Sequence, residues 1–235
     1  MIPGIKYAEF NNLDSVKALV DEKTCAIILE PVQGEGGIYP AEKEFMEGIR
    51  KICDEKDILM ICDEIQCGMG RTGKMFAFEH YDVVPDIITC AKALGCGIPV
   101  GAFVAGEKCC NSLVPGDHGT TYGGNPLATA AVSKVFDLFE ENNILAHVNQ
   151  ISGYFEEQLE KLVADFDNVL ERRGKGLMQG LVLSTPVADT VNRAIKSGLL
   201  IISAGNNVLR MVPPLIITRE HIDKMIEILR AVLSK

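Results

Sequence analysis

Three short apolar runs in the first half of the chain lead into residues that can do chemistry. The first run is followed by Glu30, with Glu35 a little further on, the second by Asp63 and the third by Lys92. A desolvated amine has a lowered pKa and can form an imine with an aldehyde. A carboxylate against a pyridine nitrogen keeps that nitrogen protonated, so the ring can accept electrons from a carbanion. The alternative is that Asp63 caps the next helix and Lys92 is a solvated surface lysine.

The elements that must position these residues alternate along the chain. Residues 25–29, 58–62 and 86–90 are continuous apolar runs of strand length, and residues 42–56 carry apolar side chains at helical spacing. This alternation predicts an α/β fold with a mostly parallel sheet covered by helices. Because polar and apolar residues do not alternate along these short runs, they predict strands buried on both faces. Ligands of such sheets bind at the carboxyl ends of the strands, so we expect the chemical residues at one edge.

The second half of the chain has a different pattern. A long helix is predicted from Asn125-Pro126 to about residue 142, because Asn suits the N-cap and Pro the first helical position. Further helices are predicted at 144–165, at 187–197 and from about 219, with short strands at 180–183, 199–202 and 208–212. We therefore expect an α/β domain over residues 1–140 and a small α+β domain over residues 141–235.

The bulk properties exclude several classes of protein. The net charge is -9, from 23 basic and 32 acidic residues, which is unfavourable for binding nucleic acid or an anionic membrane surface. No apolar run has the length of a membrane span, and the first residues lack the charged start and apolar stretch of a secretion signal. We therefore expect a soluble, cytoplasmic protein.

The eight cysteines and four histidines do not form the pattern of a metal site. Cys25, Cys62 and Cys90 fall in apolar runs, where a thiol behaves as a small hydrophobic side chain. Cys109 and Cys110 are adjacent in a polar stretch and are expected to be exposed, and we assign them no role. The expectation is reduced structural thiols and no bound metal.

Five segments resemble, in order, successive blocks of the class III aminotransferases, which use pyridoxal 5'-phosphate. They are EPVQGEGG at 30–37, DEIQ at 63–66, AKALG at 91–95, HGTTYGGNP at 118–126 and VLRMVPPL at 208–215. Their spacing is also similar to that of the family, and the likeness covers essentially the whole chain. It implies the latter part of the large domain of a type I pyridoxal-phosphate transferase, followed by its small C-terminal domain.

The resemblance also implies roles for individual residues around the cofactor. Lys92 would bind pyridoxal phosphate covalently and move the α-proton, and Asp63 would pair with the ring nitrogen. Ile65 would pack on one face of the ring, and Gln66 would hydrogen-bond its phenolic oxygen. Thr121 would bind the phosphate from the other subunit of a homodimer; a hydroxyl in a glycine-rich turn before a helix suits a phosphate on physical grounds too.

On the substrate side, the resemblance implies that Glu35 pairs with Arg210. In ornithine-type members this pair opens or closes to accept the amino donor or 2-oxoglutarate; the alternative is an ordinary surface ion pair. The later blocks are most similar to acetylornithine aminotransferases, which exchange amino groups between N-acetylornithine or ornithine and 2-oxoglutarate or glutamate in arginine biosynthesis. Ornithine, succinylornithine and 4-aminobutyrate aminotransferases remain open as alternatives.

Members of this family carry a substantial N-terminal portion, with a phosphate loop, a stacking aromatic residue and a carboxylate-binding arginine, that has no counterpart here. We therefore expect this chain to be the C-terminal part of an aminotransferase that works once that portion completes it. The alternative is a catalytically silent fragment, at most an interaction module. In either case we expect an uncovered sheet face or edge.

Overall fold

The computed structural model describes residues 3–234, which form two compact units. The first unit takes in the described parts of 1–31, 41–66 and 78–133, and the second takes in 32–40, 67–77 and the described residues from 134. The sequence led us to expect a single boundary near residue 140. The observed division falls after residue 133, and two earlier segments, 32–40 and 67–77, also belong to the second unit. These two segments belong there because Val32, Ile38, Cys67 and Ala77 are part of its buried core.

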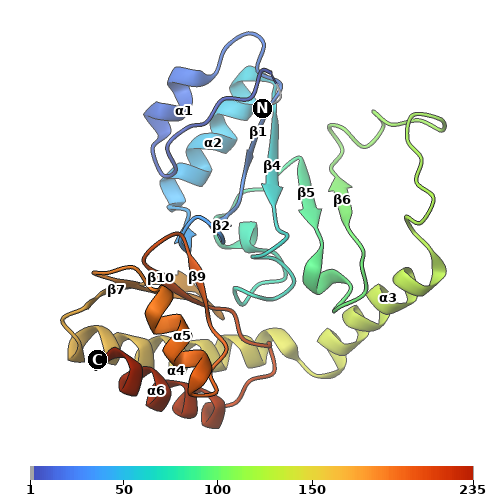
Figure 1. Cartoon of the computed structure of the whole chain (residues 1–235). Helices are drawn as coiled ribbons and strands as arrows, with labels where there is room; N and C mark the ends of the chain where they lie inside the picture. Colours follow the sequence, from blue (N-terminus) through green and yellow to red (C-terminus); the bar gives the residue numbers. More distant parts are fainter. Residues whose placement is uncertain (1–2, 235) are drawn as a thin grey trace. The chain divides into compact units, whose positions relative to one another are not determined.

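The first unit is built on a four-stranded sheet whose order is β1 (Ala26–Leu29), β4 (Leu59–Asp63), β5 (Ile87–Cys90) and β6 (Ala102–Ala105). Neighbouring pairs among β1, β4 and β5 are parallel, as the sequence predicts, and all three run toward the same end of the sheet (Figure 1). Strand β6, which the sequence analysis did not predict, pairs antiparallel with β5.

The first unit also contains helices, one of which packs on one face of the sheet. They are α1 (Leu13–Leu19), α2 (Lys43–Lys56), the short 3-10 helix η2 (Lys92–Leu94) and the start of α3 (Pro126–Glu141), while a second 3-10 helix, η1 (Ala77–His80), begins where the two units meet in the sequence. Helix α2 buries a stripe that includes Phe45 and Ile49 and packs against β1 and β4. In β4, Met60 is buried but Ile61 is only partly buried, and Ile28 of β1 is 63% exposed. Burial of these strands on both faces was therefore a wrong expectation, because α2 packs on one face; the exposed other face agrees with the expected uncovered sheet face.

The second unit has a fully antiparallel sheet of order β7 (Val169–Lys175), β8 (Met178–Leu183), β10 (Val208–Met211) and β9 (Ile202–Ala204). Its helices are α4 (Ile144–Asp165), α5 (Ala188–Lys196) and α6 (Arg219–Leu233), close to the predicted ranges. The strand expected at 199–202 starts only at Ile202, because the Leu199 amide still bonds to Ala194 at the end of α5. Strand β7 was not predicted because charged residues dominate it.

The two faces of this second sheet bury different partners. On one face, Leu181 and Leu209 belong to the large core that also contains Phe155 of α4 and Leu229 of α6. The opposite face carries a smaller core formed with the hairpin of β2 (Val32–Gln33) and β3 (Tyr39–Pro40).

Two of the three cysteines expected to be buried in apolar runs are buried. Cys62 and Cys90 are buried, as expected, and burial raises the pKa of Cys90 to about 11. Cys25 is exposed, which corrects the expectation that it is packed in an apolar run. Cys110 is exposed and Cys109 is partly so. Within residues 3–234, no helix combines the length and apolar content that a membrane span requires.

A partly buried ion pair supports the start of β5. Asp86 accepts hydrogen bonds from the Met60 amide at 2.7 Å and from the Arg50 guanidinium at 2.9 Å. Burial raises the pKa of Asp86, but the Met60 amide and Arg50 outweigh it, so the pKa lies below its ordinary value. A carboxyl group whose pKa is lower in the folded chain stabilises the fold above its unfolded pKa, about 3.9, and this stabilisation is lost as the pH falls through the folded value.

We therefore predict that Asp86→Asn lowers the free energy of unfolding by about 2–3 kcal/mol at neutral pH, because Arg50 loses its buried partner. The matched control is Asp54→Asn, which removes the exposed partner of the same guanidinium at 2.8 Å and should cost much less. Urea unfolding at several pH values measures both variants. The deficit of Asp86→Asn should shrink below about pH 4, and a deficit that stays constant there would contradict the assignment.

Candidate functional site

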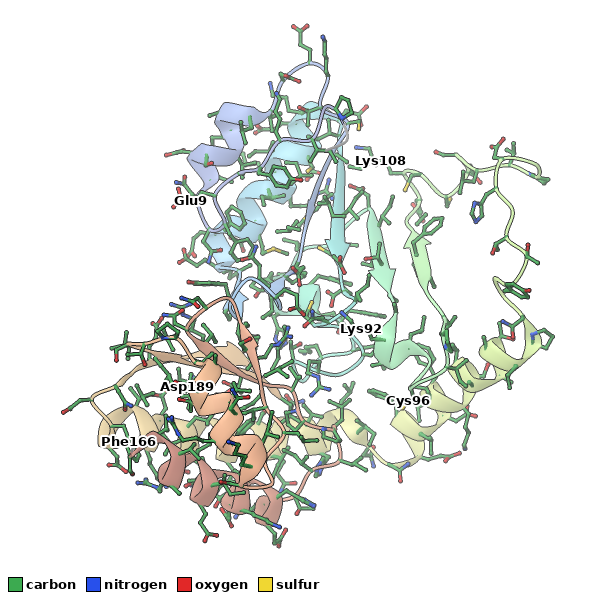
Figure 2. The ribbon with its side chains drawn as sticks, viewed as in Figure 1. Glu9, Lys92, Cys96, Lys108, Phe166 and Asp189 are labelled. Atoms are coloured by element: carbon green, nitrogen blue, oxygen red, sulfur yellow. The ribbon has the colours of Figure 1, made fainter. Side chains whose placement is uncertain are left out.

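The predicted chemical residues of the first unit lie at one end of its sheet. Glu30 follows β1, Asp63 is the last residue of β4, and Lys92 follows β5 after one residue. Asp63 is paired in register with Thr89, three residues before Lys92. Because β1, β4 and β5 are parallel neighbours, all three residues emerge at the same edge. Figure 2 shows Lys92 at this end of the strands.

The Asp63 carboxylate is fixed by a local turn. Its Oδ1 accepts a hydrogen bond from the Ile65 amide at 2.9 Å, and its side chain is partly buried. The amide of the next residue, Glu64, donates to the Thr89 carbonyl oxygen at 3.0 Å. Asp63 thus caps a turn rather than the helix considered as its alternative role, and the sheet holds that turn in place.

Lys92 lies in a strained backbone conformation at the start of a 3-10 turn. Its φ of 48° is in the left-handed region, which non-glycine residues adopt infrequently and mostly for a structural or functional reason. Among residues 3–234, its Nζ has no hydrogen-bond or ion-pair partner. The side chain is exposed, so the desolvated lysine considered from the sequence is not seen in the described chain.

A buried carboxylate that the sequence analysis missed lies next to Asp63. Glu64 is 1% exposed, and its Oε1 accepts a hydrogen bond from the Phe78 amide at 2.8 Å. Burial, and then the negative charge of Glu64, raise the pKa values of Cys62 and Cys90. The acidic pair at the end of an apolar run was a signal for this residue, but the sequence does not tell which of the two acids is buried.

The remaining predicted cofactor residues lie in two different segments of the chain. Ile65 and Gln66 belong to the turn after Asp63 and are partly exposed. Thr121 lies in an exposed segment between β6 and α3, which loops out beyond β6 (Figure 1), and it makes no hydrogen bond to any residue in 3–234. Within one chain, the structure therefore brings together Asp63, Ile65, Gln66 and Lys92, but not Thr121.

The predicted substrate residues form an ion pair within the second unit. Arg210 Nη1 lies 2.6 Å from Glu35 Oε1, although 175 residues separate the two in the sequence. The arginine side chain is 8% exposed and the glutamate side chain 73% exposed. The pair is therefore not an ordinary surface ion pair: a nearly buried cation in β10 meets a carboxylate that solvent, or another anion, can replace.

Comparison with known proteins gives the class of this chain. The chain belongs to the class III aminotransferase family, whose family model matches residues 5–233. It is 48% identical over 233 residues to the acetylornithine aminotransferase of Methanocaldococcus jannaschii, covering 99% of this chain and 58% of that relative.

Solved structures of aminotransferases resemble the chain in fold. The N-acetylornithine aminotransferase of Stenotrophomonas maltophilia superposes with a TM-score of 0.88 at 39% identity, over 97% of this chain and 62% of that one. An ornithine aminotransferase of Toxoplasma gondii, which has partial occupancy of pyridoxal phosphate at its active site, superposes with a TM-score of 0.93 at 29% identity, over 100% of this chain and 56% of that one. The chain spans 58–60% of the length of the curated relatives it matches.

Proposed function

We propose that the protein takes part in pyridoxal-phosphate-dependent transfer of the amino group between N-acetylornithine and 2-oxoglutarate, a step of arginine biosynthesis. The observation that carries this proposal is the pair of Asp63 and Lys92 at the ends of adjacent parallel strands, in a chain of the class III family. Identities of 45–49% to acetylornithine aminotransferases support N-acetylornithine as the donor.

The residues present fit pyridoxal phosphate by their chemistry. The Nζ of Lys92 has no partner among residues 3–234 and is available to bind an aldehyde. The carboxylate of Asp63, held by the Ile65 amide, suits a protonated ring nitrogen. Ile65 itself is partly exposed and can cover one face of a ring, while Gln66 can donate a hydrogen bond to a ring oxygen.

The mechanism assigns a separate task to each side chain. Bound pyridoxal phosphate supplies a ring that accepts electrons from the carbon next to the amino group. Asp63 holds a negative charge against the ring nitrogen, which keeps that nitrogen protonated. Lys92 Nζ would take the proton from the donor's Cα and hold it for return, as a positioned acid and base. Ile65 and Gln66 keep the ring in the orientation that this proton transfer requires.

On the substrate side, Arg210 and Glu35 are proposed to select between the two substrates. Arg210 is a nearly buried cation with an exposed carboxylate partner, so a carboxylate of 2-oxoglutarate can take the place of Glu35. With Glu35 on Arg210, the positive charge is neutralised and the site favours the amino donor. The proposed active form is a homodimer in the cytoplasm, in which Thr121 of each subunit binds the phosphate in the site of the other.

A transamination assay tests the proposed function directly. The chain, joined to the N-terminal portion that acetylornithine aminotransferases carry and supplied with pyridoxal phosphate, should convert 2-oxoglutarate to glutamate with N-acetylornithine as donor. Ornithine, succinylornithine and 4-aminobutyrate as alternative donors should give lower kcat/KM values. A higher value for one of them would move the assignment within the family, and no turnover with any donor would favour the catalytically silent alternative.

We further predict that Glu35→Gln lowers KM for 2-oxoglutarate by about three- to tenfold, because the competing carboxylate on Arg210 is lost. Glu160→Gln is the matched control, since it neutralises another exposed glutamate that pairs with an arginine, Arg172, in the same unit. Steady-state kinetics at varied 2-oxoglutarate measures both variants. An unchanged KM in Glu35→Gln would show that the Glu35–Arg210 pair has no part in substrate selection.

A further inference from the structure

The hairpin formed by residues 32–40 lies on a row of three residues that cross the second sheet. Arg173 of β7 and Arg210 of β10 are both paired in register with Gly180 of β8. Residues paired in this way project to the same face of a sheet, so the row presents two arginines with a glycine between them. This is the face that carries the smaller core, to which Val32 and Ile38 of the hairpin belong.

At the centre of the row, the hairpin is held by a buried and strained residue. Ile38 is fully buried at 0% exposure, and its φ of 57° lies in the left-handed region, which is rare for a β-branched side chain. A Cβ on Gly180 would lie 3.2 Å from Ile38 Cβ and 2.8 Å from Val208 Cγ1. The missing side chain of Gly180 therefore provides the space into which Ile38 fits. Backbone strain of this kind persists only where the surrounding packing holds it.

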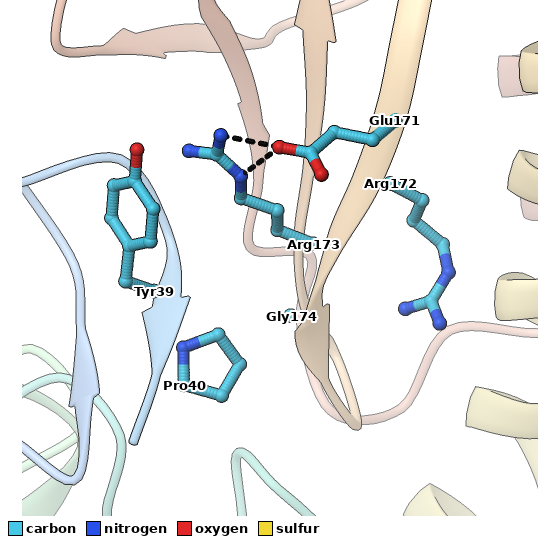
Figure 3. A pocket seen from close by; sticks show the side chains of 6 residues that line it. All are labelled: Tyr39, Pro40, Glu171, Arg172, Arg173 and Gly174. Carbon is cyan, nitrogen blue, oxygen red and sulfur yellow. Dashed lines mark hydrogen bonds and ion pairs between the residues drawn. The ribbon is translucent and has the colours of Figure 1, made fainter. Parts of the chain in front are cut away.

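At one end of the row, Tyr39 fixes the hairpin a second time. The Arg173 guanidinium lies 4.1 Å from the centre of the Tyr39 ring and is paired with Glu171 (Figure 3). A cation over an aromatic face is attractive by electrostatics. These three residues and three of their neighbours line an open pocket of about 520 Å³: Tyr39, Pro40, Glu171, Arg172, Arg173 and Gly174.

At the other end of the row, Glu35 meets Arg210 at 2.6 Å. The three contacts thus follow the register of the sheet: Tyr39 on the first residue of the row, Ile38 on the second and Glu35 on the third. The glutamate side chain itself is 73% exposed, so its own packing does not hold it in place. The rest of its turn is anchored by the residues that pack on the row.

We propose that Ile38 and Gly180 are positioning residues for Glu35, and that their fit sets how readily a substrate carboxylate displaces Glu35 from Arg210. This inference rests on the proposed function, in which Arg210 binds a carboxylate of 2-oxoglutarate. If the fit is loosened, Glu35 spends less time on Arg210. The free arginine then binds the substrate carboxylate at a lower substrate concentration.

Two variants loosen the fit in different ways. Gly180→Ala adds a Cβ that Ile38 and Val208 must move to accommodate, and Ile38→Ala removes the side chain that fills the space. The control is Leu181→Met, which alters the neighbouring residue of the same strand, whose side chain packs in the core on the other face. We expect both test variants to lower KM for 2-oxoglutarate about threefold with little change in kcat, as loss of a modest ion pair would, while the control leaves KM unchanged.

A double-mutant cycle separates positioning from general loss of packing. In a Glu35→Gln background, Gly180→Ala and Ile38→Ala should cause no further fall in KM, because the residue that they position no longer competes for Arg210. Hydrogen exchange gives a readout independent of turnover. The amides of residues 34–38, including that of Gly37, which bonds to Gly34 at 3.5 Å, should exchange faster in both variants than in the control.

The outcomes distinguish this inference from the proposed function. Suppose that the unaltered protein uses 2-oxoglutarate. If neither variant changes KM for 2-oxoglutarate, or if each variant lowers KM as much in the Glu35→Gln background as in the unaltered background, the positioning role is wrong and the proposed function stands. If the chain completed by an N-terminal portion does not use 2-oxoglutarate, the proposed function fails, and hydrogen exchange alone decides whether the fit holds the turn. Unchanged exchange in both variants would then overturn the inference.

Discussion

Lys92→Ala is expected to abolish transamination, with a loss of about a thousandfold or more, and to remove covalent attachment of pyridoxal phosphate. The substitution deletes the group at this end of β5 that can both bind an aldehyde and carry the Cα proton. In the unaltered protein, borohydride reduction in the presence of pyridoxal phosphate should fix the cofactor on the peptide that contains Lys92. Mass spectrometry of the digested protein identifies that peptide, and absorption spectroscopy follows the cofactor.

Lys108 provides the matched control for this prediction. Its Nζ bonds to the Ile58 carbonyl oxygen at 3.2 Å and to Asp57 at 2.9 Å, just before β4 begins, so it lies at the end of the sheet opposite Lys92 (Figure 2). Lys108→Ala should keep both the cofactor and the activity. Recovery of the reduced cofactor on Lys108 or Lys74 instead would show that the site has been assigned to the wrong lysine.

Asp63→Asn is expected to lower kcat by about a hundredfold or more while pyridoxal phosphate still binds. The amide keeps the size of the side chain and can still accept the hydrogen bond from Ile65, but it removes the charge that keeps the ring nitrogen protonated. The deficit should therefore appear in kcat, because the lost interaction acts on the carbanion that forms during proton transfer. Stopped-flow measurement of the half-reaction with N-acetylornithine tests this, with cofactor binding followed by absorbance.

Asp57→Asn is the control for charge removal just before the same strand. Asp57 is an exposed partner of Lys108 at the opposite end of β4, so its loss should leave kcat unchanged. Asp63→Glu should recover part of the rate, because it restores the charge at a slightly different distance. A near-normal rate in Asp63→Asn would mean that this carboxylate only caps the turn at Ile65.

Local patterns in the sequence determined the elements that position the cofactor residues. The apolar runs that became β1, β4 and β5 are short, continuous and followed by charged residues, and their order along the chain predicted parallel neighbours. The start of α3 was also predictable, since Asn125 accepts a hydrogen bond from the Ala128 amide, with proline at the first helical position. Both signals depend on residues a few positions apart, which a sequence displays directly.

The same local patterns failed where an element lacks a periodic apolar face. Strand β7 contains Glu171, Arg172 and Arg173 in succession, and its backbone is extended because β8 supplies a hydrogen-bonding partner along its length. Strands β2 and β3 have two residues each and are held mainly by the core beneath them. Their formation depends on a neighbouring surface, which composition does not reveal.

Only the tertiary structure decided the division of the chain and the surroundings of the site residues. Glu64, which accepts the Phe78 amide, rather than Asp63 is the buried acid, and Lys92 is exposed. The segment 32–40 belongs to the second unit, although its neighbours in the sequence belong to the first, because Ile38 fits the space above Gly180. More than a hundred residues separate Ile38 from Gly180 in the sequence. Residue types and spacing specify which chemistry a side chain can perform. Which side chains meet depends on the complementary shapes of surfaces that are distant in the sequence, and these exist only once the chain has folded.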